Sequence, residues 1–94
     1  MKDNQALIVV DVQKDFLETG ALPVKEGSQV VPVINRIIPK FKNVVFTQDW
    51  HPQGHISFAS SHPGIAPYST IDVSYGKQVL WPEHCVQNTS GAEF

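Results

Sequence analysis

Two short apolar runs, each ending in an aspartate, constrain the fold of this chain more than any other feature of its sequence. The first run covers residues 5–11 (QALIVVD) and the second covers residues 43–49 (NVVFTQD). The first run does not alternate between apolar and polar residues, and such a run is typical of a strand that is covered on both faces of a parallel sheet. We therefore expect two buried strands.

A helix is expected between these strands. From residue 28 the apolar side chains recur with a helical period, which predicts one buried face; they are Val30, Val31, Ile34, Ile37, Ile38 and Phe41. Ser28 is suited to cap the helix, Pro32 is tolerable in the first turn, and Pro39 should end or kink it. Residues 1–49 thus form a βαβ unit, which should be right-handed with parallel strands.

Residues 50–94 contain several prolines and all four histidines, with no helical or alternating stretch of useful length. They predict a long functional loop. Two strands and one helix would leave one face of the sheet bare and both edges unpaired, so the chain looks incomplete. With 94 residues, it is expected to be part of a single α/β domain.

Composition excludes several classes of function. A formal net charge of −2 and the absence of a basic cluster argue against a nucleic-acid or membrane-surface partner. The longest apolar run is far shorter than the ~20 residues of a membrane span, and the N-terminus does not resemble a signal peptide. A single cysteine, Cys85, excludes an intrachain disulfide. We expect a cytoplasmic protein.

Asp49, His51 and His55 form a D-x-H-x3-H cluster at the end of the second strand. Residues i and i+2 of an extended chain point to the same side, and a turn after His51 could return His55 toward them. Carboxylate and imidazole are ligands for Zn, Fe or Mn, and His84 or His62 could complete a set. Histidines beside prolines also occur in ordinary loops, so a loop that binds no metal is the alternative interpretation.

Asp11 closes the first strand as Asp49 closes the second, so the two would share one crevice. From the residues alone, Asp11 is either solvated at the sheet edge or held as an acid–base group. Phe16 is interpreted as a core residue, and Trp81 is left open between core and pocket. Cys85 follows His84, but adjacent residues point apart, so a nucleophile–base pair is not expected.

The segments IVVDVQKDF, GALPV, FTQDWHPQGHISFAS and LWPEHCVQNTSGAEF together resemble the nicotinamidase/pyrazinamidase family of the isochorismatase-like cysteine hydrolases. The resemblance runs over essentially the whole chain. It implies a three-layer α/β/α, Rossmann-like fold, of which this chain would be the N-terminal part, and an enzyme that is commonly oligomeric.

The resemblance also implies roles for individual residues. Asp11 would be the catalytic base, and Phe16 and Trp81 would be the aromatic walls of the substrate pocket. The metal ligands, with waters completing an octahedron, would be Asp49, His51, His55 and His84. Zinc is the expected metal, with iron or manganese as alternatives, and it would coordinate the pyridine nitrogen of the substrate. The one remaining histidine, His62, would be structural.

The implied reaction converts nicotinamide, and also pyrazinamide, to the acid plus ammonia through a cysteine thioester, with a place in NAD salvage. The family's lysine and nucleophilic cysteine are expected downstream of the W-P-x-H-C segment. Neither Lys77 nor Cys85 matches them, so we predict no turnover by this chain alone. The remainder of its own chain or a homo-oligomer would complete it. The alternatives are another isochorismatase-like hydrolase and a small non-catalytic metal-binding module.

Overall fold

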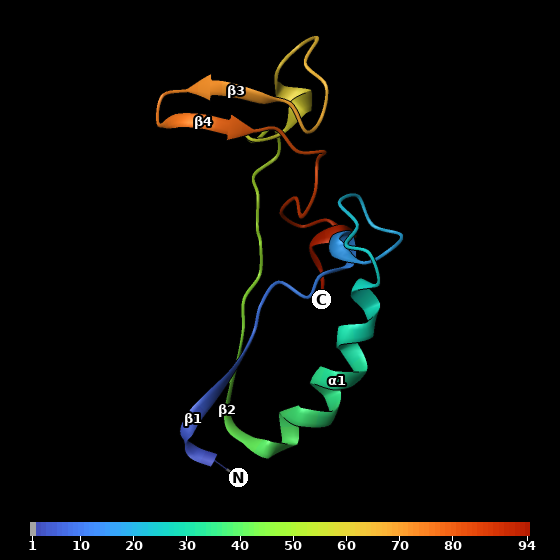
Figure 1. Ribbon diagram of the computed structural model, residues 1–94, viewed down its shortest axis with the longest axis vertical. Coiled ribbons are helices and arrows are strands. Elements are labelled where there is room, and N and C mark those ends of the chain that lie inside the picture. Colours follow the sequence, from blue (N-terminus) through green and yellow to red (C-terminus); the bar gives the residue numbers. More distant parts are fainter. Residues whose placement is uncertain (1) are drawn as a thin grey trace.

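A parallel βαβ unit forms one end of the molecule, as the sequence predicts. The computed structural model describes residues 2–94 and contains five main elements (Figure 1): β1 (Lys2–Val9), α1 (Val30–Ile37), β2 (Phe41–Phe46), β3 (Thr70–Val73) and β4 (Gly76–Val79). Strands β1 and β2 pair in parallel, with Ala6 opposite Asn43 and Val9 opposite Phe46. The predicted parallel pairing is confirmed.

The second strand ends earlier than predicted. It covers residues 41–46 rather than 43–49, although Thr47 still bonds Val9 through its N–H and Asp11 through its carbonyl. Asp11 then adopts a left-handed backbone conformation with φ of 51°. This turn takes the chain of β1 away from β2, so that Gln48 and Asp49 have no neighbouring strand to pair with.

The predicted helix is present, but its start differs from the prediction. Ser28 does not cap α1; it lies in a 3-10 turn (Gly27–Gln29), and its hydroxyl donates to Glu18 at 2.5 Å. The N-cap residue is Gln29, which makes no side-chain capping bond. The prolines act as expected: Pro32 lies in the first turn, and Pro39 lies in the 3-10 turn (Ile38–Lys40) that follows α1.

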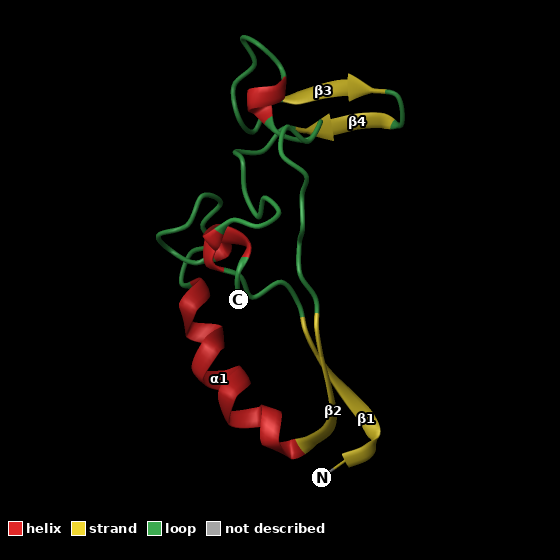
Figure 2. Cartoon of the chain, turned by 180° about the vertical axis from the view of Figure 1, so that it is seen from behind, coloured by secondary structure: helices red, strands yellow, loops and turns green. Residues whose placement is uncertain are grey.

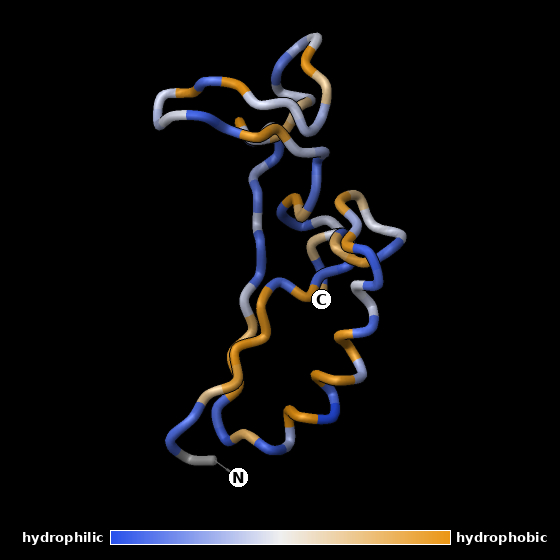
Figure 3. The backbone as a smooth tube through the Cα atoms, viewed as in Figure 1, coloured by the Kyte–Doolittle hydropathy of each residue, from blue (hydrophilic) through white to orange (hydrophobic). Residues whose placement is uncertain are grey.

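The apolar residues of the βαβ unit are only partly covered. One face of the sheet and the inner face of α1 enclose a cavity of about 350 Å³, whose apolar lining includes Val9, Leu17, Val31, Ile34, Ile38, Phe46 and Phe94. Figure 3 shows these apolar segments facing each other across the unit. On the other face, Ile8 and Val10 are 59% and 65% exposed. The face of the sheet that points away from α1 is therefore bare in residues 2–94, as expected for two strands covered by one helix.

The molecule is elongated. Its principal extents are 52 × 29 × 23 Å and its radius of gyration is 16.1 Å, against about 12 Å for a compact domain of this length. Figure 2 shows extended loop segments joining the βαβ unit to the opposite end of the molecule. In residues 2–94, no helix has the length and apolarity needed to cross a bilayer.

Residues 50–94 are more ordered than predicted. Strands β3 and β4 form an antiparallel hairpin, with Val73 opposite Gly76 around a two-residue loop. Phe58 and Leu80 are fully buried beside it, and Phe58 bridges Trp81 in parallel. The interpretation of 50–94 as a loop without strands is corrected: the apolar residues around 57–59 and 79–81 associate and form a small core.

Candidate metal centre

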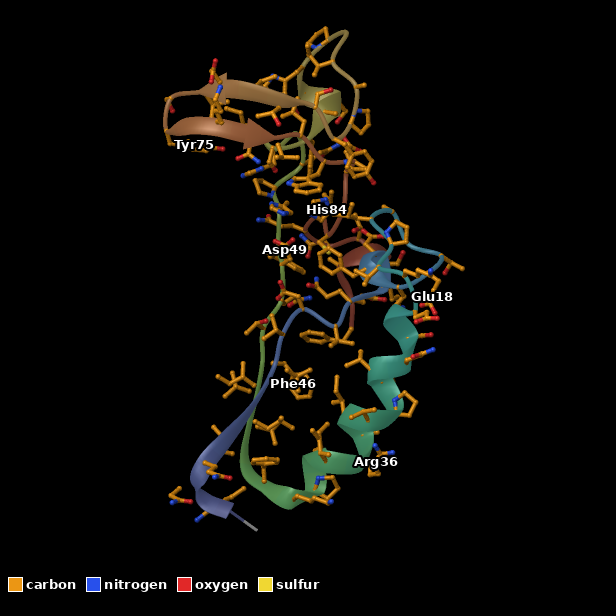
Figure 4. The ribbon with its side chains drawn as sticks, in the orientation of Figure 1. Glu18, Arg36, Phe46, Asp49, Tyr75 and His84 are labelled. Carbon is orange, nitrogen blue, oxygen red and sulfur yellow. The ribbon has the colours of Figure 1, made fainter. Side chains whose placement is uncertain are left out.

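Asp49, His51 and His84 converge between the two ends of the molecule. Each offers one ligand atom, and these atoms all lie within 4.8 Å of one another. His51 Nε2 lies 3.0 Å from the Asp49 carboxylate, and His84 Nε2 lies 3.4 Å from Asp49 Oδ2. Figure 4 shows Asp49 and His84 approaching each other from separate segments. One carboxylate and two imidazoles thus meet beyond the carboxyl end of β2.

Main-chain pairing brings the two histidine segments together. The N–H of His51 donates to the carbonyl of Cys85 at 2.9 Å, and the carbonyl of His51 accepts from the N–H of Gln87 at 2.8 Å. This short parallel bridge lies directly after His84 in the chain. His51 and His84 are therefore fixed relative to each other by backbone hydrogen bonds.

The orientation of His84 fits a cation between these side chains. Its Nδ1 lies 2.8 Å from the carbonyl oxygen of Pro82, and because a carbonyl only accepts, Nδ1 carries a proton. Its Nε2 then faces Asp49 Oδ2 at 3.4 Å, and His84 is only 5% exposed. A divalent cation between the two groups would accept a lone pair from each, and a carbonyl that accepts from the other ring nitrogen is common at metal-bound histidines.

His55 lies beside this set but is not part of it. Its ring centroid is 4.8 Å from that of His51. Its Nδ1 accepts the backbone N–H of Ser57 at 3.1 Å and lies 2.7 Å from the Ser57 hydroxyl. His62 is also outside the set, with Nε2 2.7 Å from the carbonyl of Ile56.

Two phenylalanine rings pack against the imidazoles of His51 and His84. Phe58 is fully buried, and its ring centroid lies 5.3 Å from that of His51 and 5.5 Å from that of His84. Phe16 packs against His84 at 5.6 Å. Sequence reasoning did not single out Phe58, whose only signal was its place in the HISFAS segment.

Asp11 is held by Thr47 just beyond the carboxyl end of β1. The Thr47 hydroxyl accepts the Asp11 N–H at 3.0 Å and donates to Asp11 Oδ1 at 2.7 Å. Asp11 and Phe16 both line a cavity of about 300 Å³. Trp81 does not line this cavity; its ring packs edge-on against Tyr68 at 6.0 Å.

Cys85 has no features of a nucleophile. It is fully buried, and its backbone N–H donates to Asp15 Oδ2 at 2.8 Å. Burial, followed by the negative charges of Asp49, Asp15 and Asp11, raises the pKa of the Cys85 thiol to about 12. A thiol with that pKa stays protonated at neutral pH and reacts poorly.

Comparison with known proteins assigns the family. The sequence profile of the isochorismatase domain matches residues 5–94. A nicotinamidase from Acinetobacter baylyi is 55% identical over 91 residues, which cover 97% of this chain and 42% of that protein.

Two solved structures are also similar. A nicotinamidase/pyrazinamidase from Acinetobacter baumanii superposes with a TM-score of 0.94 at 53% identity, covering 100% of this chain and 45% of that one. A pyrazinamidase from Pyrococcus horikoshii in complex with zinc has a TM-score of 0.73 at 47% identity, with 95% and 43% covered. The chain thus spans less than half the length of each protein named here. It belongs to the isochorismatase domain family, and its resemblance to nicotinamidases, first indicated by its motifs, is confirmed.

Proposed function

We propose that this chain belongs to a metal-dependent amidohydrolase that converts nicotinamide to nicotinate and ammonia and also accepts pyrazinamide. The observation that carries the proposal is the convergence of Asp49, His51 and His84 at the carboxyl end of β2. It occurs in a chain that is 55% identical to a nicotinamidase over 97% of the chain's own length. The proposed activity is that of the complete protein, since the relatives are more than twice as long as the matched segment.

The metal ligands in this proposal are Asp49, His51 and His84, with zinc as the ion. One carboxylate and two imidazoles suit Zn, Fe or Mn, and positions left open for exchangeable ligands are typical of catalytic sites. Zinc is favoured because a similar pyrazinamidase structure contains it. If bound there, the ion would act as a Lewis acid toward a ring nitrogen of the substrate.

Asp11 is proposed as the proton acceptor. The hydroxyl of Thr47 donates to Oδ1, and within residues 2–94 no hydrogen-bond donor contacts Oδ2. A carboxylate with one oxygen anchored and the other accessible is suited to take a proton from a nucleophile. Phe16, on the wall of the same cavity, would pack against the substrate ring. Trp81 does not line that cavity, and its proposed role as a second aromatic contact rests on resemblance to the family alone.

The test is hydrolysis of nicotinamide by the protein translated from its whole reading frame, followed as ammonia release. We expect turnover that a chelator abolishes and zinc restores. Asp11→Asn should lose turnover but still bind zinc, whereas His84→Ala should lose both. Zinc binding without hydrolysis of nicotinamide or pyrazinamide would exclude this substrate class and favour another hydrolase of the family.

A further inference from the structure

Gln13 is the one glutamine side chain that is completely buried within residues 2–94, and it lies against the metal-ligand segment. Its exposed fraction is 0%. Its Oε1 accepts the N–H of Asp49 at 2.8 Å, and its Nε2 donates to the carbonyls of Asp49 and Ala92, each at 2.8 Å. The orientation of the amide is fixed, since a backbone N–H only donates and a carbonyl only accepts.

These bonds replace a missing strand. The ladder between β1 and β2 stops where Asp11 turns away, and Asp49 lies beyond its end with no backbone partner in the described part of the chain. The amide of Gln13 bonds both polar groups of the Asp49 backbone, as a neighbouring strand would. It thereby fixes the backbone from which the Asp49 carboxylate reaches His51 and His84.

We infer that Gln13 is a positioning residue for the metal centre and that it sets metal affinity by holding Asp49 in its ligating conformation. This inference rests on the proposed function. A ligand held in place before metal arrives does not have to be ordered on binding, and removal of such supporting groups weakens metal binding by about 10- to 100-fold.

Gln48 supplies a matched control. Its Nε2 donates to the same carbonyl of Ala92, at 2.9 Å, but its side chain makes no bond to Asp49. Methionine is similar in size to glutamine but has no amide, so either replacement removes one hydrogen bond to the Ala92 carbonyl. Only Gln13→Met also releases the backbone of Asp49. Because Gln13 is buried and Gln48 is exposed, the Asp49→Ala background separates that effect from the cost of disturbing the interior.

The experiment measures the dissociation constant for Zn²⁺ of the complete protein by competition with a chromophoric chelator, below the unfolding range of every variant. We expect Gln13→Met to raise the constant about 10- to 100-fold and Gln48→Met to leave it unchanged. In an Asp49→Ala background, Gln13→Met should have no further effect, because the ligand that it positions is gone. If Gln13→Met does not fold, Gln13→Asn decides by the same measurement.

Three outcomes would overturn the inference: unchanged zinc affinity in Gln13→Met with only a lower unfolding temperature, an equal loss in Gln48→Met, or an undiminished effect in the Asp49→Ala background. Wild-type protein that binds no zinc would overturn the proposed function and this inference together. Zinc binding that ignores Gln13 would overturn this inference alone.

Discussion

The hydroxyl of Thr47 holds Asp11 by two hydrogen bonds, one to its backbone and one to its carboxylate. It accepts the Asp11 N–H at 3.0 Å and donates to Oδ1 at 2.7 Å. Asp11 has a φ of 51°, a left-handed conformation that aspartate tolerates better than most residues. The two bonds secure this conformation at the point where the chain leaves β1, and they fix the direction of the carboxylate.

Replacement of Thr47 should therefore impair the proposed hydrolysis of nicotinamide by the complete protein. Thr47→Val keeps the shape and the backbone bond from the Asp11 N–H to the Thr47 carbonyl, but loses both bonds made by the hydroxyl. A hydrogen bond to a charged group contributes about 1.5–3 kcal/mol, so kcat/KM for nicotinamide should fall about 10- to 100-fold. Thr47→Ser retains the hydroxyl and should stay near wild type. Equal activity of the valine and serine variants would contradict a role for this hydroxyl.

The four histidines should differ in their contribution to metal binding. His51→Ala and His84→Ala remove atoms of the converging set, so each should lose most of its zinc affinity. His55→Ala should lose less, because Nδ1 of His55 is engaged with Ser57. Equilibrium dialysis against Zn²⁺ compares the variants, with His62→Ala as the control outside the set. A loss in His55→Ala as large as that in His84→Ala would make His55 a ligand.

The sequence predicted the βαβ unit because its signals are local. A continuous apolar run indicates a buried strand. The helical period of the apolar residues predicts α1, and the two prolines near its ends indicate where it begins and stops. The hairpin was missed because β3 and β4 have four residues each and their loop, Ser74–Tyr75, lacks the Asn-Gly or Asp-Gly signature of a two-residue turn. Gly76, with φ of 126°, takes the unusual conformation just after that loop.

The site was predictable only in part. The spacing of Asp49 and His51 suggested that they converge. The place of His84 beside them was expected only from the family resemblance, because it depends on backbone pairing between His51 and residues 85–87. The supporting residue Gln13 had no sequence signal as a partner of Asp49. Side-chain amides that replace a strand become visible only when the backbone is placed.

Acid should weaken the attachment of the loop that precedes α1. Ser28 donates to Glu18 from its hydroxyl and from its backbone N–H, and the hydroxyl bond is the main cause that lowers the pKa of Glu18 below its ordinary value of 4.5. A lowered pKa in the folded state adds stability that is fully present above pH 4.5 and is lost as pH falls through the folded value.

Denaturant midpoints measured from pH 6 to pH 3 test this prediction. The wild type should lose more stability toward acid than Glu18→Gln, which cannot titrate. Ser28→Ala removes the main cause of the shift and should also flatten the curve. Parallel curves for all three proteins would mean that Glu18 is not coupled to folding. The effect should be small, because Glu18 is exposed.

Cys85 should resist modification in the folded protein. Its side chain is fully buried, so a disulfide reagent such as DTNB has no access until the surrounding segment opens. We expect no reaction of Cys85 in native buffer and one equivalent in denaturant. To distinguish Cys85 from any other cysteine of the complete protein, the modified peptide is identified by mass spectrometry. Rapid native labelling of Cys85 would contradict the buried position.

Gly91 should be intolerant of a side chain, because Asp15 occupies the space beside it. A Cβ on Gly91 would overlap the Asp15 carboxylate, whose Oδ2 accepts the N–H of Cys85 at 2.8 Å. Gly91→Ala must displace that carboxylate and leave a buried donor unpaired. The expected loss in unfolding free energy is about 1–3 kcal/mol, measured by denaturant titration.

Two controls separate this overlap from the general effect of replacing glycine. Gly64 has open space around it but a φ of 79°, so Gly64→Ala should cost only the conformational penalty of about 1–2 kcal/mol and should not depend on Asp15. In an Asp15→Ala background the overlap at Gly91 disappears, and Gly91→Ala should then cost clearly less than it does in the wild type. An unchanged cost would show that the Asp15 carboxylate does not restrict residue 91.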